Sequence, residues 1–529
     1  YLVKKELSGR SIIGRGRGNE NANTFQAVDP RSGEVTGPLF FSTDPEELAR
    51  AAFLAAEART QFGKLPCRSK AKFLRRIADN IESLGDDLVR RASLETALPA
   101  ARIEGERART CFQLRMFADL LEEGSWVEAR IDLPDKNRLP LPKPDLRSML
   151  VPLGPVAVFC ASNFPLAYSV AGGDTASAFA AGCPVIVNAH PAHPGTAELV
   201  GLAVAEAVRT CDLPEGVFSL LLSKDYEIGQ ALVRRPEIKA VGFTGSRAGG
   251  RALMDIAASR QEPIPMYCEM GSINPVFILP GAMAERQAEI AAGLHASFTL
   301  GGGQFCTKPG LVILPESPHL PAFTEKLLEL TTDTANSTLL TPGIKANYDK
   351  GIKSRSAALD SHLEAKNHEQ FSVEATVFQT DAQEFLQTPE LADEIFGPTT
   401  LLVTAGTRDR LIDIANSIEG QLTAAVFGTN EDLMEFTELI EILETKVGRI
   451  IFNGFPTGVE VGHAIVHGGA YPATSDSRST SVGTRAITRF SRLVCYQGFP
   501  QDALPAELID ENPNRIWRMV DGKMRNDPV

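Results

Sequence analysis

Five short apolar segments recur along the middle of the chain, and a segment of helical character separates each one from the next. The apolar segments span residues 156–162, 184–190, 216–222, 240–245 and 265–271. Their continuous hydrophobicity predicts strands covered on both faces, and their alternation with helices predicts a parallel sheet joined by right-handed crossovers. Ligands of such sheets bind beyond the carboxyl ends of the strands, so we expect functional residues to follow these segments.

The flanking regions predict three further parts. Residues 1 to about 45 are rich in turn signals, and from Asp44 to about residue 124 apolar spacings of three and four predict a layer of amphipathic helices. Alternating apolar residues and many prolines around 131–150 predict a two-stranded ribbon. Strands and helices alternate again after residue 306. We therefore expect an α/β protein with a Rossmann-like domain, a second α/β domain and a small β ribbon.

Length and composition favour a large globular protein without nucleic-acid or membrane partners. The chain has 529 residues, of which 43% are hydrophobic and 22% charged, so two or three domains are expected. A formal net charge of -13 argues against non-specific binding to nucleic acids, which requires a basic surface. No apolar run approaches the roughly 18 residues of a membrane span, and the first residues lack a signal-peptide core.

One of the eight cysteines lies in an unusual setting. The cysteines are scattered without CxxC pairs, which predicts reduced thiols, a cytoplasmic location and no metal site. A lone cysteine is most often a small buried apolar residue. Cys306, however, follows the run Gly301 to Gly303, which lets the backbone approach a ligand closely. With Lys308 as a neighbouring cation, this setting favours the interpretation of Cys306 as a nucleophilic thiolate.

A nucleophile of this kind requires a general base and a group that stabilises an oxyanion. Glu269 is the candidate base, because its neighbours Cys268 and Met270 predict partial desolvation, which raises the pKa of a carboxyl group. Asn163 is the candidate amide donor, and its alternative is a turn-forming role. Glu394 is either a functional carboxylate or an ordinary loop residue.

Three small residues, Gly245, Ser246 and Gly250, lie between the fourth apolar strand and the helix after it. At this position, glycines and free helix N-terminal amides could bind a phosphate or a dinucleotide. The segment does not match the GxGxxG pattern, and glycine is common in strand-to-helix turns, so a structural role is the alternative.

Five motifs, ASNFP, GFTGSRAGG, CEMGSINP, GGGQFCTKPG and EIFGP, occur in this order along the chain. Their order and approximate spacing resemble the aldehyde dehydrogenase superfamily over nearly the whole chain. The resemblance implies that Cys306 attacks the aldehyde carbonyl, that Asn163 and the Cys306 backbone N–H hold the oxyanion, and that Glu269 activates water to hydrolyse the thioester. It also implies that Glu394 binds the nicotinamide ribose, with Phe396 packed nearby.

Within the superfamily the chain is most similar to the NADP-accepting branch that includes 2-oxoglutarate semialdehyde dehydrogenase. By this resemblance the adenosine ribose of the cofactor binds near Asn188, His190 and Pro191. Asn188 replaces the family's usual lysine, and Pro191 replaces a glutamate common in NAD-preferring relatives. Without that carboxylate a 2′-phosphate is not repelled, so we expect NADP to be accepted, with NAD as the alternative. Lys224 is the candidate for the missing cation.

The resemblance also predicts the residues that line the aldehyde tunnel. These are Arg115, Phe164, Tyr168, Phe305, Phe455 and Pro456. Arg115 either lies on the helix surface or faces the tunnel, where it would pair with a substrate carboxylate. The second position would favour a semialdehyde acid, such as 2-oxoglutarate semialdehyde, over a medium-chain or long-chain aldehyde.

The resemblance divides the chain into domains. Residues 1–130 and 151–265 would form the dinucleotide-binding domain, and 266–470 the catalytic domain. An oligomerisation ribbon would comprise 131–150 and 471–500, and a C-terminal tail 501–529. Because such ribbons cover an otherwise exposed sheet edge, we expect a homodimer or a tetramer.

Three other functions remain open. A CoA-acylating relative would pass the acyl group to a thiol, but a water-activating Glu269 argues against this. A cysteine hydrolase would pair Cys306 with a histidine, and none of the eight histidines lies in a motif that does so. A non-catalytic relative with a weakened cofactor site is favoured only by Asn188.

Overall fold

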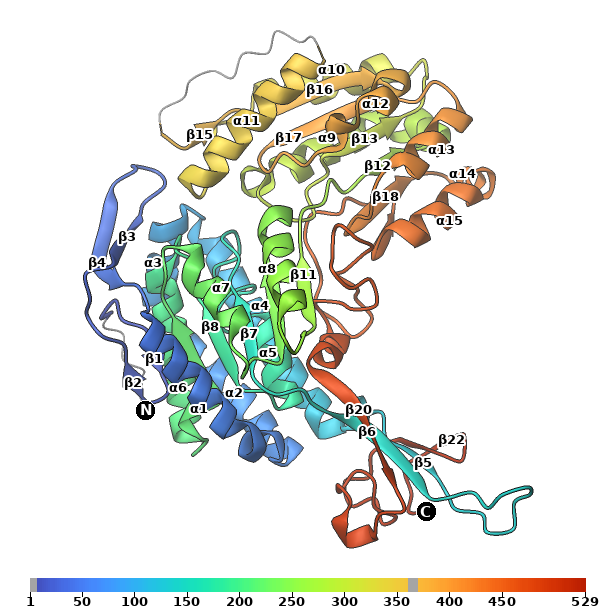
Figure 1. Cartoon of the computed structure of the whole chain (residues 1–529). Coiled ribbons are helices and arrows are strands. Elements are labelled where there is room, and N and C mark those ends of the chain that lie inside the picture. Colours follow the sequence, from blue (N-terminus) through green and yellow to red (C-terminus); the bar gives the residue numbers. More distant parts are fainter. Residues whose placement is uncertain (1–6, 360–369) are drawn as a thin grey trace.

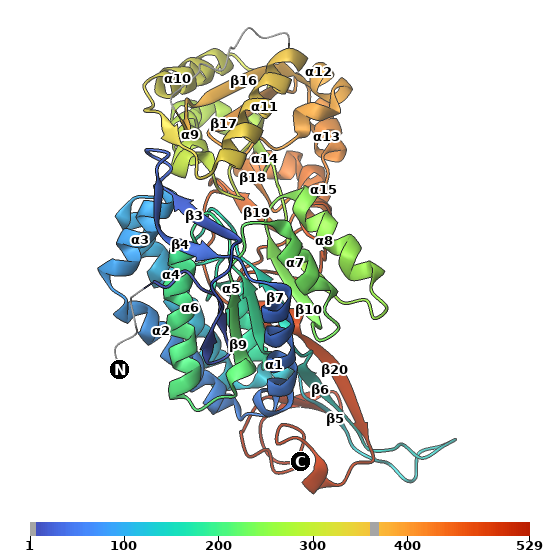
Figure 2. The ribbon, with the colours of Figure 1, turned by 60° about the vertical axis from the view of Figure 1, so that its left-hand side comes forward.

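The computed structural model describes residues 7–359 and 370–529, which form two α/β bodies and a β ribbon (Figure 1). The first half of the chain builds one body, and the yellow and orange part of Figure 1 builds the other. Figure 2 shows from a second direction that the ribbon and the second body lie at opposite ends of the first body. The expected α/β class with a separate ribbon is confirmed.

The first sheet contains all five predicted apolar strands. These are β7 (Val156–Phe159), β8 (Val185–Asn188), β9 (Phe218–Leu221), β10 (Ala240–Thr244) and β11 (Met266–Glu269). Their order is β11-β10-β7-β8-β9, and all four pairings are parallel as predicted. The short strands β1 (Ile12–Ile13) and β2 (Gly16–Arg17) extend the sheet beyond β9 in antiparallel pairing. The five parallel strands therefore end along one side, here called the carboxyl edge.

Helices cover both faces of this sheet. They are α1 (Pro45–Gly63), α2 (Cys67–Ser83), α3 (Asp86–Thr96), α4 (Ala100–Glu123), α5 (Gly173–Ala181), α6 (Pro194–Thr210), α7 (Tyr226–Arg234) and α8 (Arg247–Ser259). Side chains of β7 alternate between the two cores: Val158 packs with α2 to α6, and Ala157 with α1, α7 and α8. The α1 N-terminus is fixed by a capping box between Asp44 and Glu47. The antiparallel hairpin of β3 (Thr24–Val28) and β4 (Val35–Phe41) forms a separate two-stranded sheet.

The second sheet is parallel throughout, in the order β16-β17-β13-β12-β18-β19. Its strands are β12 (Val276–Ile278), β13 (Leu311–Leu314), β16 (Thr376–Asp381), β17 (Thr399–Thr404), β18 (Thr423–Phe427) and β19 (Arg449–Phe452). Its helices are α9 (Pro280–Thr299), α10 (Leu320–Thr332), α11 (Pro342–Ala358), α12 (Ala382–Gln387), α13 (Arg408–Ser417), α14 (Asn430–Glu435) and α15 (Thr437–Lys446). A small antiparallel pair, β14 (Ser337–Thr338) and β15 (Ser372–Val373), lies beside them.

The ribbon is a five-stranded sheet in the order β20-β6-β5-β21-β22. It consists of β5 (Arg130–Asp132), β6 (Leu146–Pro152), β20 (Ser491–Gln497), β21 (Arg518–Val520) and β22 (Lys523–Arg525). The C-terminal segment predicted as a separate tail therefore supplies two strands of the ribbon.

Residues 471–490 were expected in the ribbon, but they lie against the first body instead. The backbone N–H of Met270 donates to the Ala473 carbonyl group at 2.8 Å, and Arg489 forms an ion pair with Asp174 of α5. Backbone hydrogen bonds and a largely buried ion pair, rather than strand pattern, decide where this segment packs. In the part of the chain that the structure describes, no helix is both long and apolar enough to cross a membrane.

Candidate active site

Cys306 lies in a loop that only glycine-rich sequence can form. Gly301, Gly302 and Gly303 all have left-handed backbone conformations, with φ of 58°, 67° and 67°. A side chain on Gly303 would place its Cβ 2.2 Å from the carbonyl oxygen of Gly397, so glycine is required for this close approach. The side chain of Asn274 then fixes the loop, since its Nδ2 donates to the Cys306 carbonyl oxygen at 2.8 Å.

Glu269 is the last residue of β11 and lies on the carboxyl edge, as expected. Its side chain is 4% exposed, and both carboxylate oxygens accept hydrogen bonds. Oε2 accepts from the Ser481 hydroxyl group at 2.7 Å, and Oε1 lies 2.8 Å from Nε2 of His467. Cys306 and Glu269, which are far apart in the sequence, are thus brought to the same site.

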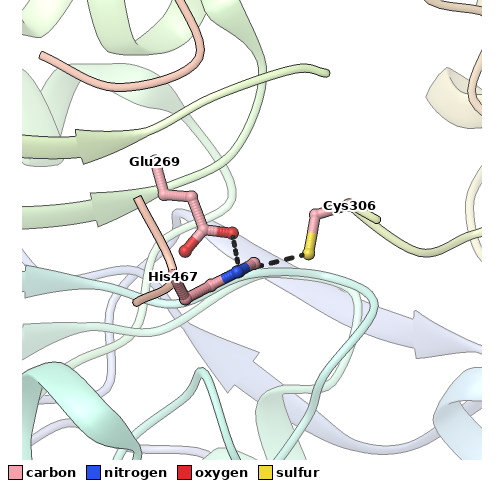
Figure 3. Close-up of side chains that lie close together, drawn as sticks. All are labelled: Glu269, Cys306 and His467. Atoms are coloured by element: carbon pink, nitrogen blue, oxygen red, sulfur yellow. Dashed lines mark hydrogen bonds and ion pairs between the residues drawn. The ribbon is translucent and has the colours of Figure 1, made fainter. Parts of the chain in front are cut away.

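His467 lies between these two groups, although no pattern in the sequence predicted it there (Figure 3). Its Nε2 is 2.8 Å from Glu269 Oε1 and 3.6 Å from Cys306 Sγ. The three ligand-type atoms lie within 4.8 Å of one another, close enough to hold a metal ion, although no metal site was expected. The only sequence signal was the pair of glycines after His467, which permits close packing of a loop.

This arrangement differs from the triad of a cysteine hydrolase. In such a triad one ring nitrogen of the histidine contacts the nucleophile and the other contacts the carboxylate. Here, Nε2 of His467 contacts both groups, and Nδ1 has no hydrogen-bond partner among the described residues. The geometry therefore does not favour the hydrolase alternative, even though it supplies the histidine.

Burial and charge set the protonation of the two central groups. Burial raises the pKa of the Cys306 thiol group well above its ordinary value, and the Glu269 carboxylate raises it further. Burial alone would raise the pKa of Glu269, but His467, Ser481 and Cys306 together hold it below its ordinary value. The resting site therefore contains a thiol group beside a carboxylate that can take its proton.

Lys308 does not act as the expected cation beside Cys306. Its Nζ donates to the carbonyl oxygens of Ile395 and Thr399, at 3.0 and 2.8 Å, and so holds the segment that contains Glu394. Burial lowers the pKa of Lys308 to about 7, and burial raises the pKa of Glu394 to about 7. The predicted effect of Lys308 on the thiol is therefore wrong, since its amino group is used to position another loop.

Aromatic side chains and Asn163 surround the cysteine loop. Nδ2 of Asn163 donates to the Gln304 carbonyl oxygen at 2.9 Å, two residues before Cys306. Phe164 lies 5.1 Å from Tyr168 and 5.5 Å from Phe305 between ring centroids, and Tyr168 lies 6.1 Å from His467. The structure thus brings three of the predicted tunnel residues, Phe164, Tyr168 and Phe305, together with Asn163 at the site.

Arg115 was predicted to line the aldehyde tunnel, but the structure places it elsewhere. It lies on the outer surface of α4 and forms ion pairs with Glu82 and Asp79 of α2 at 2.6 and 2.9 Å. Arg109 of the same helix faces the site instead: its Nη2 lies 3.4 Å from the Tyr168 hydroxyl group. Its charge lowers the pKa of Cys306, against the larger effects of burial and Glu269.

The loop that includes Phe455 and Pro456 contacts the other flank of the cysteine. The N–H of Gly458 donates to Oγ1 of Thr307 at 3.2 Å, next to Cys306. The half-buried ring of Phe455 packs on Phe427, at 4.6 Å between centroids, against the hydrophobic core of the second body. The Pro456 carbonyl oxygen accepts from Arg449 of β19 at 2.7 Å.

The predicted cofactor residues follow the strands along the carboxyl edge. Asn188 ends β8, Gly245 and Ser246 follow β10, and Lys224 is exposed beyond β9. The Oδ1 atom of Asn188 is buried and accepts no hydrogen bond from the described residues, so it can accept one from a ribose hydroxyl group. A buried acceptor without a partner, at the carboxyl edge of a parallel sheet, is the kind of group that a bound dinucleotide can contact.

The other predicted cofactor residues near this edge differ in charge, exposure and packing. Burial lowers the pKa of His190 to about 3, so the ring is neutral and brings no charge to a phosphate. Pro191 next to it is exposed. The Ser246 hydroxyl group caps α8 by accepting from the Gly249 N–H, and a side chain on Gly250 would collide with Met270, its Cβ lying 2.7 Å from the sulfur.

Glu394 and Phe396 lie in the segment that contacts both the cysteine loop and the end of β11. A Cβ on Gly271 would lie 2.3 Å from Oε2 of Glu394, so this carboxyl group packs directly on the chain after Glu269. Both Glu394 and Phe396 are partly exposed. Their position between the two α/β bodies fits the predicted contact with a cofactor.

Comparison with known proteins agrees with this geometry. Residues 18–490 match the model of the "Aldehyde dehydrogenase family". The chain is 47% identical to alpha-ketoglutaric semialdehyde dehydrogenase 2 of Azospirillum brasilense, over 98% of this chain and 99% of that protein. It is 42% identical to alpha-ketoglutaric semialdehyde dehydrogenase of Acinetobacter baylyi, again over 98% and 99%.

Solved structures show the same fold at low sequence identity. A 3,6-anhydro-L-galactose dehydrogenase in complex with NAP has a TM-score of 0.78 at 20% identity, covering 92% of this chain and 99% of that one. Betaine aldehyde dehydrogenase of Staphylococcus aureus in complex with NAD+ has a TM-score of 0.78 at 20% identity, covering 94% and 96%. With a family match over most of its length and full-length relatives above 40% identity, this chain belongs to the aldehyde dehydrogenase family.

Proposed function

We propose that this protein oxidises a semialdehyde acid, such as 2-oxoglutarate semialdehyde, to the corresponding dicarboxylate, with NADP or NAD as oxidant. The observation that carries this proposal is the geometry of Cys306, Glu269 and Arg109 at one site: a thiol group, a base and a cation without a carboxylate partner among the described residues. The names of the two full-length relatives point to the same substrate.

In the first half of the reaction Cys306 is the nucleophile. Its thiol proton passes to Glu269, and the thiolate attacks the aldehyde carbon to form a thiohemiacetal. The oxyanion is stabilised by the Asn163 amide and the Cys306 backbone N–H. The nicotinamide ring, when bound, supplies the hydride acceptor. Asn188 and Glu394 are the residues that would hold the two riboses of the cofactor.

In the second half Glu269 is the general base. After its first proton has left to solvent, Glu269 takes a proton from a water molecule, and the resulting hydroxide attacks the thioester carbon. The C–S bond breaks, the carboxylic acid forms, and Cys306 returns as a thiolate. Retention of a buried, doubly hydrogen-bonded Glu269 supports hydrolysis over transfer of the acyl group to CoA.

The choice between NADP and NAD follows from the charges near Asn188. No carboxylate stands at Pro191, so a 2′-phosphate meets no repulsion there, and Lys224 is an exposed cation beyond β9. The neutral His190 adds no positive charge. We propose that NADP is accepted and that NAD is also used.

Arg109 is proposed to bind the substrate carboxylate. The Nε of Arg109 is buried and has no hydrogen-bond partner among the described residues. Arg449 also carries a buried, unpartnered Nε, and it is close enough to Cys306 and Tyr168 for their charges to raise its pKa, which burial lowers. Two guanidinium groups beside an aromatic wall suit a short aldehyde with a charged end better than an alkyl aldehyde.

Replacing Arg109 with leucine should weaken binding of charged substrates alone. We expect the KM for 2-oxoglutarate semialdehyde to rise by about 10- to 100-fold, the effect of losing a hydrogen bond to a charged group. The KM for an uncharged medium-chain aldehyde should not rise. Arg115→Leu is the matched control, because this arginine lies on the same helix but outside the site. Equal effects of both variants would contradict the assignment of Arg109.

The function itself is tested by following the absorbance of the reduced nicotinamide. Purified protein is given NADP or NAD in separate reactions with 2-oxoglutarate semialdehyde, succinate semialdehyde or a medium-chain aldehyde. A chelator is included, because the site can hold an adventitious metal ion. The proposal predicts the highest kcat/KM for a semialdehyde acid. Preference for the medium-chain aldehyde would favour the alternative substrate class.

We also propose that the ribbon mediates a homodimer or a tetramer. Apolar side chains on the ribbon are exposed, including Leu139 at 88%, Leu141 at 69% and Leu493 at 62%. Such a surface is expected to be buried against another copy. Native mass spectrometry at micromolar concentration should give a dimer or tetramer, and a stable monomer would contradict the proposal.

A further inference from the structure

The position of His467 is fixed by its own backbone. Its N–H donates to Oγ1 of Thr480 at 2.9 Å, and its carbonyl oxygen accepts from the N–H of Ser481 at 2.8 Å. The next residue, Gly468, is so close to Ser479 that a Cβ there would lie 2.4 Å from the Ser479 carbonyl oxygen. The side chain of His467 is 0% exposed, so its ring has a defined orientation toward the cysteine loop.

The hydrogen of the His467 ring can be placed from its contacts. Nδ1 is buried and has no partner among the described residues, so a hydrogen there would be a buried donor without an acceptor. Nε2 faces the Glu269 carboxylate at 2.8 Å, where a hydrogen is strongly favoured. We therefore place the ring hydrogen on Nε2.

This single N–H faces two groups that exchange one negative charge during the reaction (Figure 3). Before the reaction the charge is on Glu269, and the N–H donates to the carboxylate. When the thiol proton passes to Glu269, the charge moves to Cys306, whose sulfur lies 3.6 Å from the same nitrogen. The N–H can then donate to the thiolate without any movement of the loop.

We propose that His467 is a catalytic residue whose Nε2–H stabilises the negative charge alternately on the Glu269 carboxylate and on the Cys306 sulfur. The proposal rests on the proposed function and names a third residue of its site. In thiolate formation the S–H bond breaks, a carboxyl O–H bond forms, and His467 keeps its own hydrogen throughout. When the thioester is hydrolysed, the same N–H stabilises the departing thiolate.

Among the described residues, the other titratable groups around the thiol make no hydrogen bond to His467. Arg109 of α4 lowers the pKa of Cys306, whereas Glu394 raises it. Arg449 of β19 and Tyr168 also lie within electrostatic range of Cys306. Variants of His467 leave these groups in place, so a change in thiol ionisation reports on the histidine.

The test measures thiol ionisation without turnover. The rate of alkylation of Cys306 by iodoacetamide is followed from pH 5 to about pH 11, near the limit at which thiols titrate, by mass spectrometry of the peptide that contains it. Wild type is compared with His467→Phe, which keeps a ring but has no donor, and His467→Gln, which keeps an N–H. His295→Phe is the matched control, because that histidine lies on α9 and contacts Thr334. His467→Met replaces the Phe variant if the latter does not fold.

We expect the Phe variant to raise the apparent pKa of Cys306 by about one pH unit and to slow alkylation at neutral pH about 10-fold, since a buried thiolate loses a donor. The Gln variant should lie between the Phe variant and wild type, and His295→Phe should match wild type. The kcat of the Phe variant should fall by about 100-fold. An unchanged or lowered apparent pKa in a folded Phe variant would overturn the proposal. If the Phe variant shows the expected rise in the pKa of Cys306 but wild type oxidises no aldehyde, the proposed function fails while the role of His467 in thiol ionisation stands.

Discussion

Replacing Cys306 with alanine is expected to abolish aldehyde oxidation, with a loss in kcat of about 10⁴-fold or more, because no other group can form the thioester. The Cys306 thiol lies within 4.8 Å of its proposed proton acceptor, Glu269, whereas the buried cysteines lie in the cores. Steady-state production of reduced nicotinamide with the best semialdehyde measures the effect. Binding of the cofactor, followed by fluorescence, should persist in the variant.

Cys495→Ser is the control for general effects of removing a thiol. Cys495 is exposed on β20 in the ribbon, far along the chain from the catalytic loop. Its replacement should leave kcat within about twofold, as is usual for surface changes. Residual turnover in Cys306→Ala above one hundredth of wild type would exclude Cys306 as the obligatory nucleophile.

Replacing Glu269 with glutamine is expected to slow thioester hydrolysis by about 10²- to 10⁴-fold, because an amide cannot take a proton from water. The first half of the reaction should survive, because the thiol proton can then pass to solvent instead of to Glu269. The Glu269 carboxylate raises the pKa of Cys306, so removing its charge makes the thiolate easier to form. Rapid mixing with aldehyde and cofactor should therefore show a burst of about one reduced nicotinamide per subunit, followed by slow turnover.

The matched control is Glu262→Gln, which removes an exposed carboxylate paired with Lys239 at the surface of the first body. It should show no burst beyond that of wild type and an unchanged steady-state rate. If Glu269→Gln turned over as fast as wild type, another base would have to activate water. If it showed neither burst nor turnover, Glu269 would be indispensable as the acceptor of the thiol proton, and solvent could not replace it in that role.

Much of the first sheet could be predicted from the sequence, because its strands are buried on both faces and read as continuous apolar segments. The residues after these strands were placed at one edge for the same reason, since parallel strands point their carboxyl ends in one direction. Glu269 was proposed in this way, whereas Cys306 was proposed from the glycine run before it. The packing of residues 471–490 could not be predicted from the sequence, because short irregular segments held by backbone hydrogen bonds show no hydrophobic periodicity.

The resemblance predicted Arg115 in the aldehyde tunnel, but another arginine of the same helix, Arg109, faces the site. Arg109 and Arg115 are six residues apart on α4, and at about 100° per residue their side chains point in directions roughly 120° apart. The resemblance located the helix, but only the packing of α4 against α2 shows that Arg115 faces two carboxylates there. The side chain of Arg109 instead contacts the Tyr168 hydroxyl group.

The sequence by itself determined the α/β class and singled out the proposed nucleophile and its proposed base, because each depends on local features: apolar strands, a glycine run before a cysteine, and a carboxyl group in an apolar strand end. The third member of the site was decided only by the tertiary structure. His467 is 161 residues from Cys306 and 198 from Glu269, and it has no motif of its own. Its role depends on distances of a few ångströms between a strand end and two loops, and such distances arise from packing of the whole chain rather than from local sequence.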